Sequence, residues 1–589
     1  MASFACLAPV TYLGGRNSAS KPRWLGWGVL LMGAGSLLFA LPHFLVPPYK
    51  IAGEEMDDLC TVNQTVSSWK EEPSEGGAWA VAVFVVAQLL HGAGATPLFT
   101  LGVTYIDENV SKKMSSVYLA TSDAGVPREG TEGGEALRKE RAWIETTRSI
   151  EMRVVLGITP LSSSWIGAWW VGFIFSAVLC LIVALPLLAF PYELPGASEI
   201  RASKVSEAHE GAATKSAAFS ALRELPKAAA ALFKNPTFMF LNLAGASEGM
   251  LISGFAAFLP KLIENQFSVS ASEAAMLLGV ITVPAGGGGT FLGGWLVKRW
   301  KLNCGGIIKL CVAATLAAAV FCISFVLSCD DYPFAGVTIP YDSPSVANAS
   351  RLTAQCNLAC SCSYSRSTAV CGADGRAYAS PCHAGCTRAA RYGATTLYAD
   401  CACVSGGGVY TTEDNQTIAY EAINNACSSE CPYLWLFVFL SFCVMLFTFI
   451  ATMPALSATL RCVREDQRSF ALGIQWILVR LLGTIPAPLL FGFLIDLSCR
   501  LWTSGACQLY DNYHMSRYML ALALVGKLCS VLFFFFAWWF YRPPTAKNAI
   551  SPAIDLTHEK ANGIPTIANG TLDRSNGYCN AALECSDHL

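Results

Sequence analysis

Charged residues are scarce in this sequence. Asp, Glu, Lys and Arg make up 14% of its 589 residues, whereas ordinary soluble domains carry about a quarter. Hydrophobic residues make up 53%, which is the composition of a membrane protein. The formal net charge of -2 is too small to indicate a nucleic-acid partner.

A phosphate-binding loop is also lacking. The glycine-rich stretch "PAGGGGTFLGG", residues 284–294, has no Lys-Ser/Thr ending and lies inside an apolar run, so it does not fit a P-loop. Gly289 and Gly293 instead have the spacing that lets two membrane helices approach closely. Nothing in the sequence indicates catalysis, and we expect no enzyme activity, no cofactor and no metal site.

Long apolar runs dominate what is present. A helix of about 20 apolar residues crosses a bilayer. The first run contains no Asp, Glu, Lys or Arg and is too long for the h-region of a signal peptide, so no cleavable targeting peptide is apparent. The sequence predicts nine spans, at residues 24–46, 78–106, 165–190, 238–259, 274–297, 305–328, 433–459, 470–496 and 518–541.

Basic clusters orient these runs, because cytosolic loops are enriched in Lys and Arg. Clusters at 298–304 and 460–469 place both turns in the cytosol, so the interval between them lies outside. In the first half, run 78–106 ends inside, whereas run 165–190 has to enter from outside. One crossing is missing, and the polar segment 121–164 in the gap has no apolar stretch long enough to span.

These patterns divide the chain into regions. The predicted regions are an incomplete N-terminal transmembrane half at 1–190 with 121–164 in place of a span, a cytosolic linker at 191–237, transmembrane helices of the second half at 238–328 and 433–541, an extracellular cysteine-rich loop at 329–432, and a cytosolic tail at 542–589.

Eleven of the 24 cysteines lie in the cysteine-rich loop. Its sequons at Asn348 and Asn415, and another at Asn63 in the first outward loop, indicate an oxidising compartment in which such cysteines pair. Close cysteine pairs leave zinc binding open, although disulfides are favoured. The eleven are Cys329, Cys356, Cys360, Cys362, Cys371, Cys382, Cys386, Cys401, Cys403, Cys427 and Cys431. An odd number cannot pair internally, so Cys60, Cys499 and Cys507 are further candidates.

The stretch "SWIGAWWVGFIF", Ser164 to Phe175, closely resembles the signature of the organic anion transporting polypeptides. "HGAGATPLFTLGVTYIDENV" at 91–110 and "ATLRCVREDQRSFALGIQWILVRLLG" at 458–483 also match in order, and the chain looks closest to the fourth subfamily. The signature residues are Trp165, Gly167, Ala168, Trp169, Trp170, Gly172 and Phe173.

The resemblance implies an all-α polytopic membrane protein, a major facilitator-like helix bundle with a small disulfide-rich Kazal-like extracellular module. "VCGADGRAYASPCHAGC" matches the Kazal core, but the loop between Cys362 and Cys371 is a residue longer than in the usual inhibitor. That difference favours a structural cap over protease inhibition.

The same resemblance implies multi-pass insertion in the plasma membrane, among lipids, and sodium-independent transport of amphipathic organic anions. Expected substrates are thyroid hormones, steroid conjugates, bile acids and prostaglandins, with bicarbonate as a counter-anion. Compared with the family's twelve spans, the first is absent, the second survives as residues 6–15, and the fifth is replaced by 121–145. We expect an incomplete or mis-spliced gene model and no transport by this polypeptide. The alternative function is a non-transporting, membrane-anchored Kazal-like binding or inhibitory module.

Ionisable residues inside the spans are the candidate substrate-binding residues, because they are costly in a membrane. Arg480 suits a carboxylate or sulfate, and the resemblance strengthens it, since the family carries an important arginine in this span. His43 and His91 titrate near neutral pH, and Glu248 would pair with a buried cation or form a gate. Structural pairing, or a side chain that reaches the membrane interface, is the competing interpretation for each.

The C-terminal "SDHL" has a form that suits a PDZ groove, although a disordered tail is the favoured interpretation of residues 542–589.

The predicted topology is testable by glycosidase treatment of the expressed chain. We expect a mobility shift that becomes smaller in the Asn348→Gln/Asn415→Gln double variant, because both sequons lie in the cysteine-rich loop, and Asn63 accounts for the remainder. A shift unaffected by the double variant would contradict an extracellular position for this loop.

Overall fold

The computed structural model describes most of the hydrophobic part of the chain. All described elements belong to one unit, Met1–Pro544. The described residues are 2–15, 19–46, 59–60, 77–110, 168–197, 199, 225–269, 271–331, 333–341, 352–360, 362, 369–392, 395–411, 417–424, 427, 431–464, 467–503 and 506–543.

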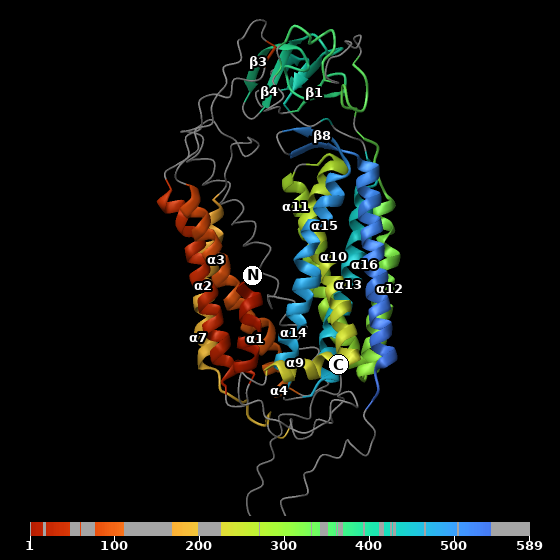
Figure 1. The fold of residues 1–589 in the computed structure, drawn as a ribbon. Helices are drawn as coiled ribbons and strands as arrows, with labels where there is room; N and C mark the ends of the chain where they lie inside the picture. The colour runs from red at the N-terminus through yellow and green to blue at the C-terminus, as the bar shows by residue number, and fades with distance from the viewer. Residues whose placement is uncertain are drawn as a thin grey trace, which may run out of the picture. The chain divides into compact units, whose positions relative to one another are not determined.

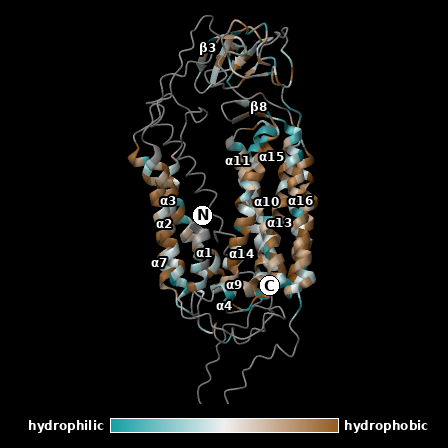
Figure 2. Ribbon diagram, in the orientation of Figure 1, coloured by the Kyte–Doolittle hydropathy of each residue, from teal (hydrophilic) through white to brown (hydrophobic). Residues whose placement is uncertain are grey.

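Nine helices within these residues are long and apolar enough to cross a membrane, and each overlaps one of the nine predicted spans. Figure 2 shows hydrophobic residues along most of the length of α2, α3 and α16. The expected fold class, an all-α polytopic membrane protein with a disulfide-rich module, is confirmed. The missing crossing falls on residues 121–164, which lie outside the described residues, so it remains a prediction.

The first half is built around α2, which packs against both α3 and α7 (Figure 1). In the middle of one span, α3 passes into a π-helix, η1, and then α4. The first-half helices are α1 (Ala2–Gly14), α2 (Lys21–Leu45), α3 (Gly77–Pro97), η1 (Leu98–Gly102), α4 (Val103–Asn109) and α7 (Trp169–Ala189).

The second half has α10, α12, α13 and α16 side by side, with α11 packed against α13 (Figure 1). A second π-helix, η6, interrupts the span formed by α14 and α15. The helices are α9 (Leu225–Phe233), α10 (Pro236–Phe267), α11 (Ala271–Arg299), α12 (Cys304–Phe321), the 3-10 helix η3 (Cys322–Val326), α13 (Leu434–Cys462), α14 (Arg468–Val479), η6 (Arg480–Thr484), α15 (Pro486–Asp496) and α16 (Asn512–Phe540).

Glycine spacing brings α11 and α13 into close contact, as the sequence predicts. A Cβ atom at Gly289 would lie 2.8 Å from the carbonyl oxygen of Leu446, and one at Gly293 would lie 2.4 Å from that of Ile450. No larger residue fits at these two positions without a shift of the α13 backbone. The glycine-rich run is therefore a helix-packing surface.

The cysteine-rich loop contains a five-stranded antiparallel sheet with strand order β2-β1-β7-β4-β3. Two separate hairpins, β5–β6 and β8–β9, lie in the loops that precede α13 and α16. The strands are β1 (Val370–Gly372), β2 (Ala377–Tyr378), β3 (Cys386–Tyr392), β4 (Thr395–Cys401), β5 (Gly408–Thr411), β6 (Thr417–Tyr420), β7 (Ala422–Ile423), β8 (Cys499–Thr503) and β9 (Ala506–Tyr510).

All eleven cysteines of this loop are in disulfides, with Cys60 of the first half as the twelfth partner. Cys499 and Cys507, which the sequence left as candidate partners, bond to each other across the β8–β9 hairpin. The other pairs are Cys60–Cys360, Cys329–Cys431, Cys356–Cys403, Cys362–Cys382, Cys371–Cys427 and Cys386–Cys401.

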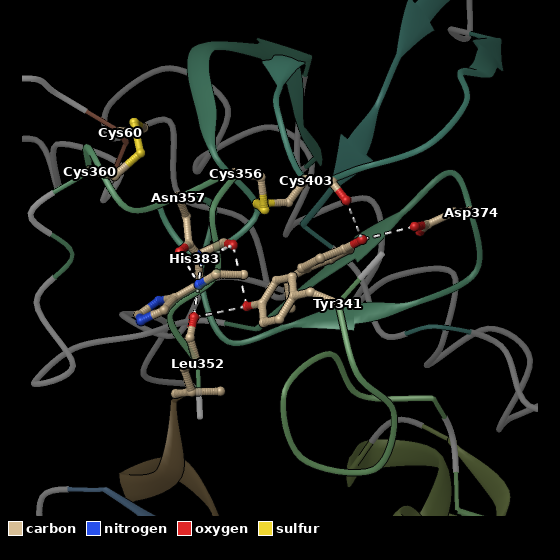
Figure 3. Close-up of a disulfide and its surroundings, with 11 residues drawn as sticks. Cys60, Tyr341, Leu352, Cys356, Asn357, Cys360, Asp374, His383 and Cys403 are labelled. Atoms are coloured by element: carbon tan, nitrogen blue, oxygen red, sulfur yellow. Dashed lines mark hydrogen bonds between the residues drawn. A yellow bond between two sulfur atoms is a disulfide. The ribbon is translucent and has the colours of Figure 1, made fainter. Parts of the chain in front are cut away.

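A buried polar network accompanies these disulfides (Figure 3). Asn357 donates from Nδ2 to the carbonyl oxygens of Leu352 (3.0 Å) and His383 (2.9 Å). The Tyr341 hydroxyl donates to the Leu352 carbonyl oxygen (3.1 Å). The predicted Kazal tyrosine, Tyr378, is buried and donates to the carbonyl oxygen of Cys403 (2.9 Å). The Kazal-like classification itself, and the loop that would contact a protease, remain predictions.

A carboxylate caps the last span. Asp511 is the N-cap of α16 and accepts hydrogen bonds from the backbone N–H (2.9 Å) and ring Nδ1 (2.8 Å) of His514. Arg500, on the preceding hairpin, donates to the same carboxylate and also pairs with Asp331 (3.1 Å). Burial alone would raise the pKa of Asp511, but the hydrogen bonds from His514 and Arg500 outweigh it and lower the pKa to about 2.

Replacement of this cap is expected to destabilise the protein. Asp511→Ala should cost about 1–2 kcal/mol at pH 7. Because the pKa is about 2 in the folded protein against an ordinary 3.8, the stabilisation is present above about pH 4 and is lost as the pH falls towards 2. The melting temperatures of wild type and Asp511→Ala should therefore approach each other between about pH 4 and pH 2.

Asp511→Asn is the matched control, because asparagine is an equally good N-cap but cannot form the ion pair with Arg500. It should lose less stability than Asp511→Ala at pH 7. Equal melting temperatures for wild type and Asp511→Ala at pH 7 would contradict the role of this cap.

Candidate functional site

One face of α14 and the start of η6 meets the first half of the molecule. Ser469, Gly473, Trp476 and Arg480 are spaced by four, three and four residues, which places them on one side of a helix. The first three contact α4, α1 and η1 respectively. We call these four residues the α14 face.

Two of these contacts are close. Ser469 donates from its hydroxyl to that of Thr104 on α4, at 3.1 Å. A Cβ atom at Gly473 would lie 2.4 Å from Oγ1 of Thr11 on α1, so glycine is needed here for the two helices to touch. The two halves therefore pack directly at this end of α14.

A largely buried ion pair joins the halves beside these contacts. Arg468 and Asp107 are separated by 3.0 Å from Nη1 to Oδ2, with side chains only 7% and 12% exposed. Arg468 also donates from Nε to the carbonyl oxygen of Leu460 (3.0 Å). From the sequence, Arg468 was one of the charges that orient the 460–469 turn; the structure gives it a specific partner 361 residues away.

Aromatic residues form the next contact along the α14 face. The rings of Trp476 and Phe99, on η1, have centroids 5.5 Å apart. The guanidinium of Arg480 lies over the Trp476 ring at 5.9 Å. Within the part of the chain that the structure describes, the guanidinium has no carboxylate partner and no hydrogen bond. Arg480 is thus a half-buried cation at the end of the surface along which the halves meet.

Glu248 lies in a different place and is paired. Its Oε2 accepts a hydrogen bond from Nζ of Lys527 at 2.6 Å, and Lys527 also donates to Oγ1 of Thr448 at 2.7 Å. The side chains of Lys527 and Glu248 are 1% and 11% exposed. This ion pair connects α10, α13 and α16 inside the second half. The sequence analysis missed Lys527, although a lone lysine in an apolar run carries the same signal as Arg480.

The two predicted histidines belong to the first half. His91, on α3, is 3.0 Å from the hydroxyl of Ser36 through Nε2. His43, near the end of α2, stacks on the Trp170 ring with centroids 4.8 Å apart. Among the described residues no ion pair, hydrogen bond or ring contact joins any two of the four predicted substrate residues. The structure thus does not gather them into one cluster.

The family-signature residues that are described line the start of α7. Ala168 is its N-cap, and Trp169 and Phe173 contact the ring of Phe39 on α2 at 6.1 and 4.2 Å. Gly172 has open space around it. Trp165 and Gly167 lie outside the described residues, as do the sequons at Asn63, Asn348 and Asn415. The described part of the signature therefore packs α7 against α2.

Comparison with known proteins gives consistent results. A family model described as the Organic Anion Transporter Polypeptide (OATP) family matches residues 1–515. The chain is 40% identical to mouse (Mus musculus) solute carrier organic anion transporter family member 4A1, over 96% of this chain and 78% of that protein. It is 36% identical to human (Homo sapiens) member 4C1, over 95% and 76%.

A solved structure also aligns. It is a bacterial homolog of the human lysosomal transporter Spinster, inward-facing and unoccupied, with a TM-score of 0.41 and 12% identity over 94% of this chain and 91% of that one. This similarity is too low to carry an argument.

The Glu248–Lys527 pair gives a stability prediction. Lys527→Met leaves the buried Glu248 carboxylate without its cation, so we expect a loss of about 3–5 kcal/mol, measured as a lower thermal unfolding temperature of the purified protein in detergent. The Glu248→Gln/Lys527→Met double variant removes both charges and should recover much of this loss. A Lys527→Met protein that unfolds at the wild-type temperature would contradict the importance of the pair.

Proposed function

The chain belongs to the Organic Anion Transporter Polypeptide (OATP) family, and from that premise we propose that the function of this architecture is to carry amphipathic organic anions across the plasma membrane by alternating access, without sodium. Translocation would require the crossing that the sequence predicts to be missing at 121–164. It is a multi-pass membrane protein. The proposed substrates are thyroid hormones, steroid conjugates, bile acids and prostaglandins, and the proposed counter-anion is bicarbonate.

The observation that carries this proposal is the position of Arg480. A cation inside a membrane span is costly unless it is paired or faces a polar space. Glu248, Lys527, Asp107 and Arg468 are all paired, whereas Arg480 has only the Trp476 ring beside it. An anionic group would supply the missing partner, and an adjoining apolar body would pack on the aromatic rings.

The contacts between the halves along α14 suit alternating access. The α14 face contributes a hydrogen bond and a ring contact, and the neighbouring Arg468 contributes an ion pair. Each is a side-chain contact that can part while both helices remain intact. We propose that these contacts separate when the halves change orientation and form again when they return.

The alternative function concerns the cysteine-rich loop alone. It has its own sheet and takes part in six disulfides, and the sequence predicts a missing crossing at 121–164. A membrane-anchored binding module would need only these features. Anion binding distinguishes the two proposals, because the module offers no counterpart of Arg480 within a membrane span.

Anion recognition and translocation are separable steps. Recognition uses the α14 face, whereas translocation also requires a complete set of crossings. We expect Arg480→Ala to weaken equilibrium binding of a radiolabelled steroid sulfate to the purified full chain by about tenfold or more, because a charge-assisted hydrogen bond is lost. Arg480→Lys should weaken it less, since it keeps the charge but not the bidentate geometry.

Arg517→Ala is the matched control. Arg517 also lies over an aromatic ring, that of Tyr513 at 4.9 Å, but it is on α16 and outside the α14 face. The Arg517→Ala variant should bind the steroid sulfate as tightly as wild type does. Uptake of the same steroid sulfate into cells is then measured: binding without uptake supports the predicted missing crossing, and uptake contradicts it. Wild-type protein that neither binds nor takes up the anion would contradict the proposed function.

A further inference from the structure

We propose that Phe99 and Trp476 form a ring-binding clamp that makes this site bind anions whose charged group is attached directly to an aromatic ring, such as aryl sulfates and aryl carboxylates, more tightly than saturated anions of the same charge. This inference rests on the proposed function and goes beyond it, because it assigns two further residues and ranks the proposed ligands by affinity. The clamp is defined as these two side chains.

The first step of the argument is where the contacts between the halves end. Along the α14 face, Ser469 and Gly473 are in tight contact with the first half. Trp476 makes the last contact, through Phe99. Arg480 continues the same face one turn further with no described partner from the first half. The clamp thus lies between the closed part of the interface and Arg480, whose guanidinium has no ion pair among the described residues.

The second step concerns an unsatisfied donor. The indole Nε1–H of Trp476 is buried and has no hydrogen-bond partner among the described residues. A buried donor without a partner costs free energy, so most such groups in proteins are paired. Trp476 and Arg480 are one helical turn apart, and neither the indole N–H nor the guanidinium has a hydrogen bond among the described residues. Two neighbouring donors of this kind match the paired oxygens of a sulfate or carboxylate.

The third step concerns the rings. Their planes are tilted by 51°, and the Phe99 side chain is 43% exposed, so one partner of the pair has open aromatic surface. Aromatic rings favour further rings in offset or edge-to-face contact. A flat aromatic ligand can therefore extend the pair, whereas a saturated ring gains only apolar contact.

The fourth step is distance. The guanidinium is 5.9 Å from the centre of the Trp476 ring. A ligand whose own ring packs on Trp476 while its anionic group meets the guanidinium therefore needs that group close to its ring. A sulfate or carboxylate bonded to an aromatic ring meets this requirement. A charge at the end of a long flexible chain does not use both groups together.

The backbone supports this location. Phe99 lies in η1 and Arg480 begins η6, so a π-helical segment is present on each side of the contact. Such segments are rare and occur frequently at functional sites. Here they occur in the two spans that meet at the clamp.

The test is equilibrium binding of two matched probes, 2-naphthyl sulfate and its fully saturated decahydro analogue, to the purified full chain. Wild type should bind the aromatic probe more tightly. Phe99→Leu and Trp476→Leu should each weaken the aromatic probe by roughly three- to tenfold, as the loss of an aromatic contact implies. Phe99→Leu should leave the saturated probe within twofold of wild type. Trp476→Leu also removes the indole N–H, so it should weaken the saturated probe as well, but by less than the aromatic one.

Two variants keep the test decisive. Trp476→Phe retains a ring but lacks the N–H. It should therefore keep much of the preference for the aromatic probe while binding both sulfates more weakly. It replaces Trp476→Leu if that variant does not fold. Trp435→Leu removes a tryptophan that is largely exposed on α13 and should change nothing.

The outcomes separate this inference from the proposed function. Equal binding of both probes by wild type, or equal losses for both probes in Phe99→Leu and Trp476→Leu, would overturn the clamp while leaving anion binding intact. Failure of wild type to bind either probe or the steroid sulfate would overturn the proposed function, and the clamp with it.

Discussion

A charge placed inside a membrane must have a partner or face a polar space, and this constraint organises the structure. Only 14% of the residues are charged, so each ionisable group within the spans is conspicuous. Lys527 is neutralised by Glu248 inside one half, and Arg468 by Asp107 between the halves. Arg480, on the α14 face, has only the Trp476 ring beside it among the described residues. The pairing of the others is what makes Arg480 informative.

The two ion pairs have different structural consequences. Glu248 and Lys527 both belong to the second half, so their bond holds α10 against α16 through any movement of that half as a body. Asp107 and Arg468 belong to opposite halves, so their bond has to break whenever that end of the interface opens. One pair therefore contributes to the rigidity of a half, and the other to the balance between its orientations relative to the first half.

Local sequence patterns predicted the elements but not their partners. Apolar runs located all nine described spans, and the spacing of Gly289 and Gly293 predicted a close helix contact, which the structure makes with α13. The cysteine density predicted disulfides, and an odd count pointed to a partner outside the loop, among Cys60, Cys499 and Cys507. For the ion pairs across 279 and 361 residues, a charge in or beside an apolar run is visible in the sequence, but nothing local identifies its partner. Trp476 was hidden for a similar reason, because an indole in an apolar run reads as ordinary packing until Phe99 is seen beside it.

The disulfides connect the cysteine-rich loop unequally to the two halves. Cys329–Cys431 joins the two ends of the loop. Cys329 is three residues beyond η3 and Cys431 is three residues before α13, so the loop is attached directly to the second half. Cys60–Cys360 also attaches it to the first half, but Cys60 is separated from the end of α2 by 14 residues. The loop is therefore fixed closely to the second half and joined to the first by a longer covalent connection.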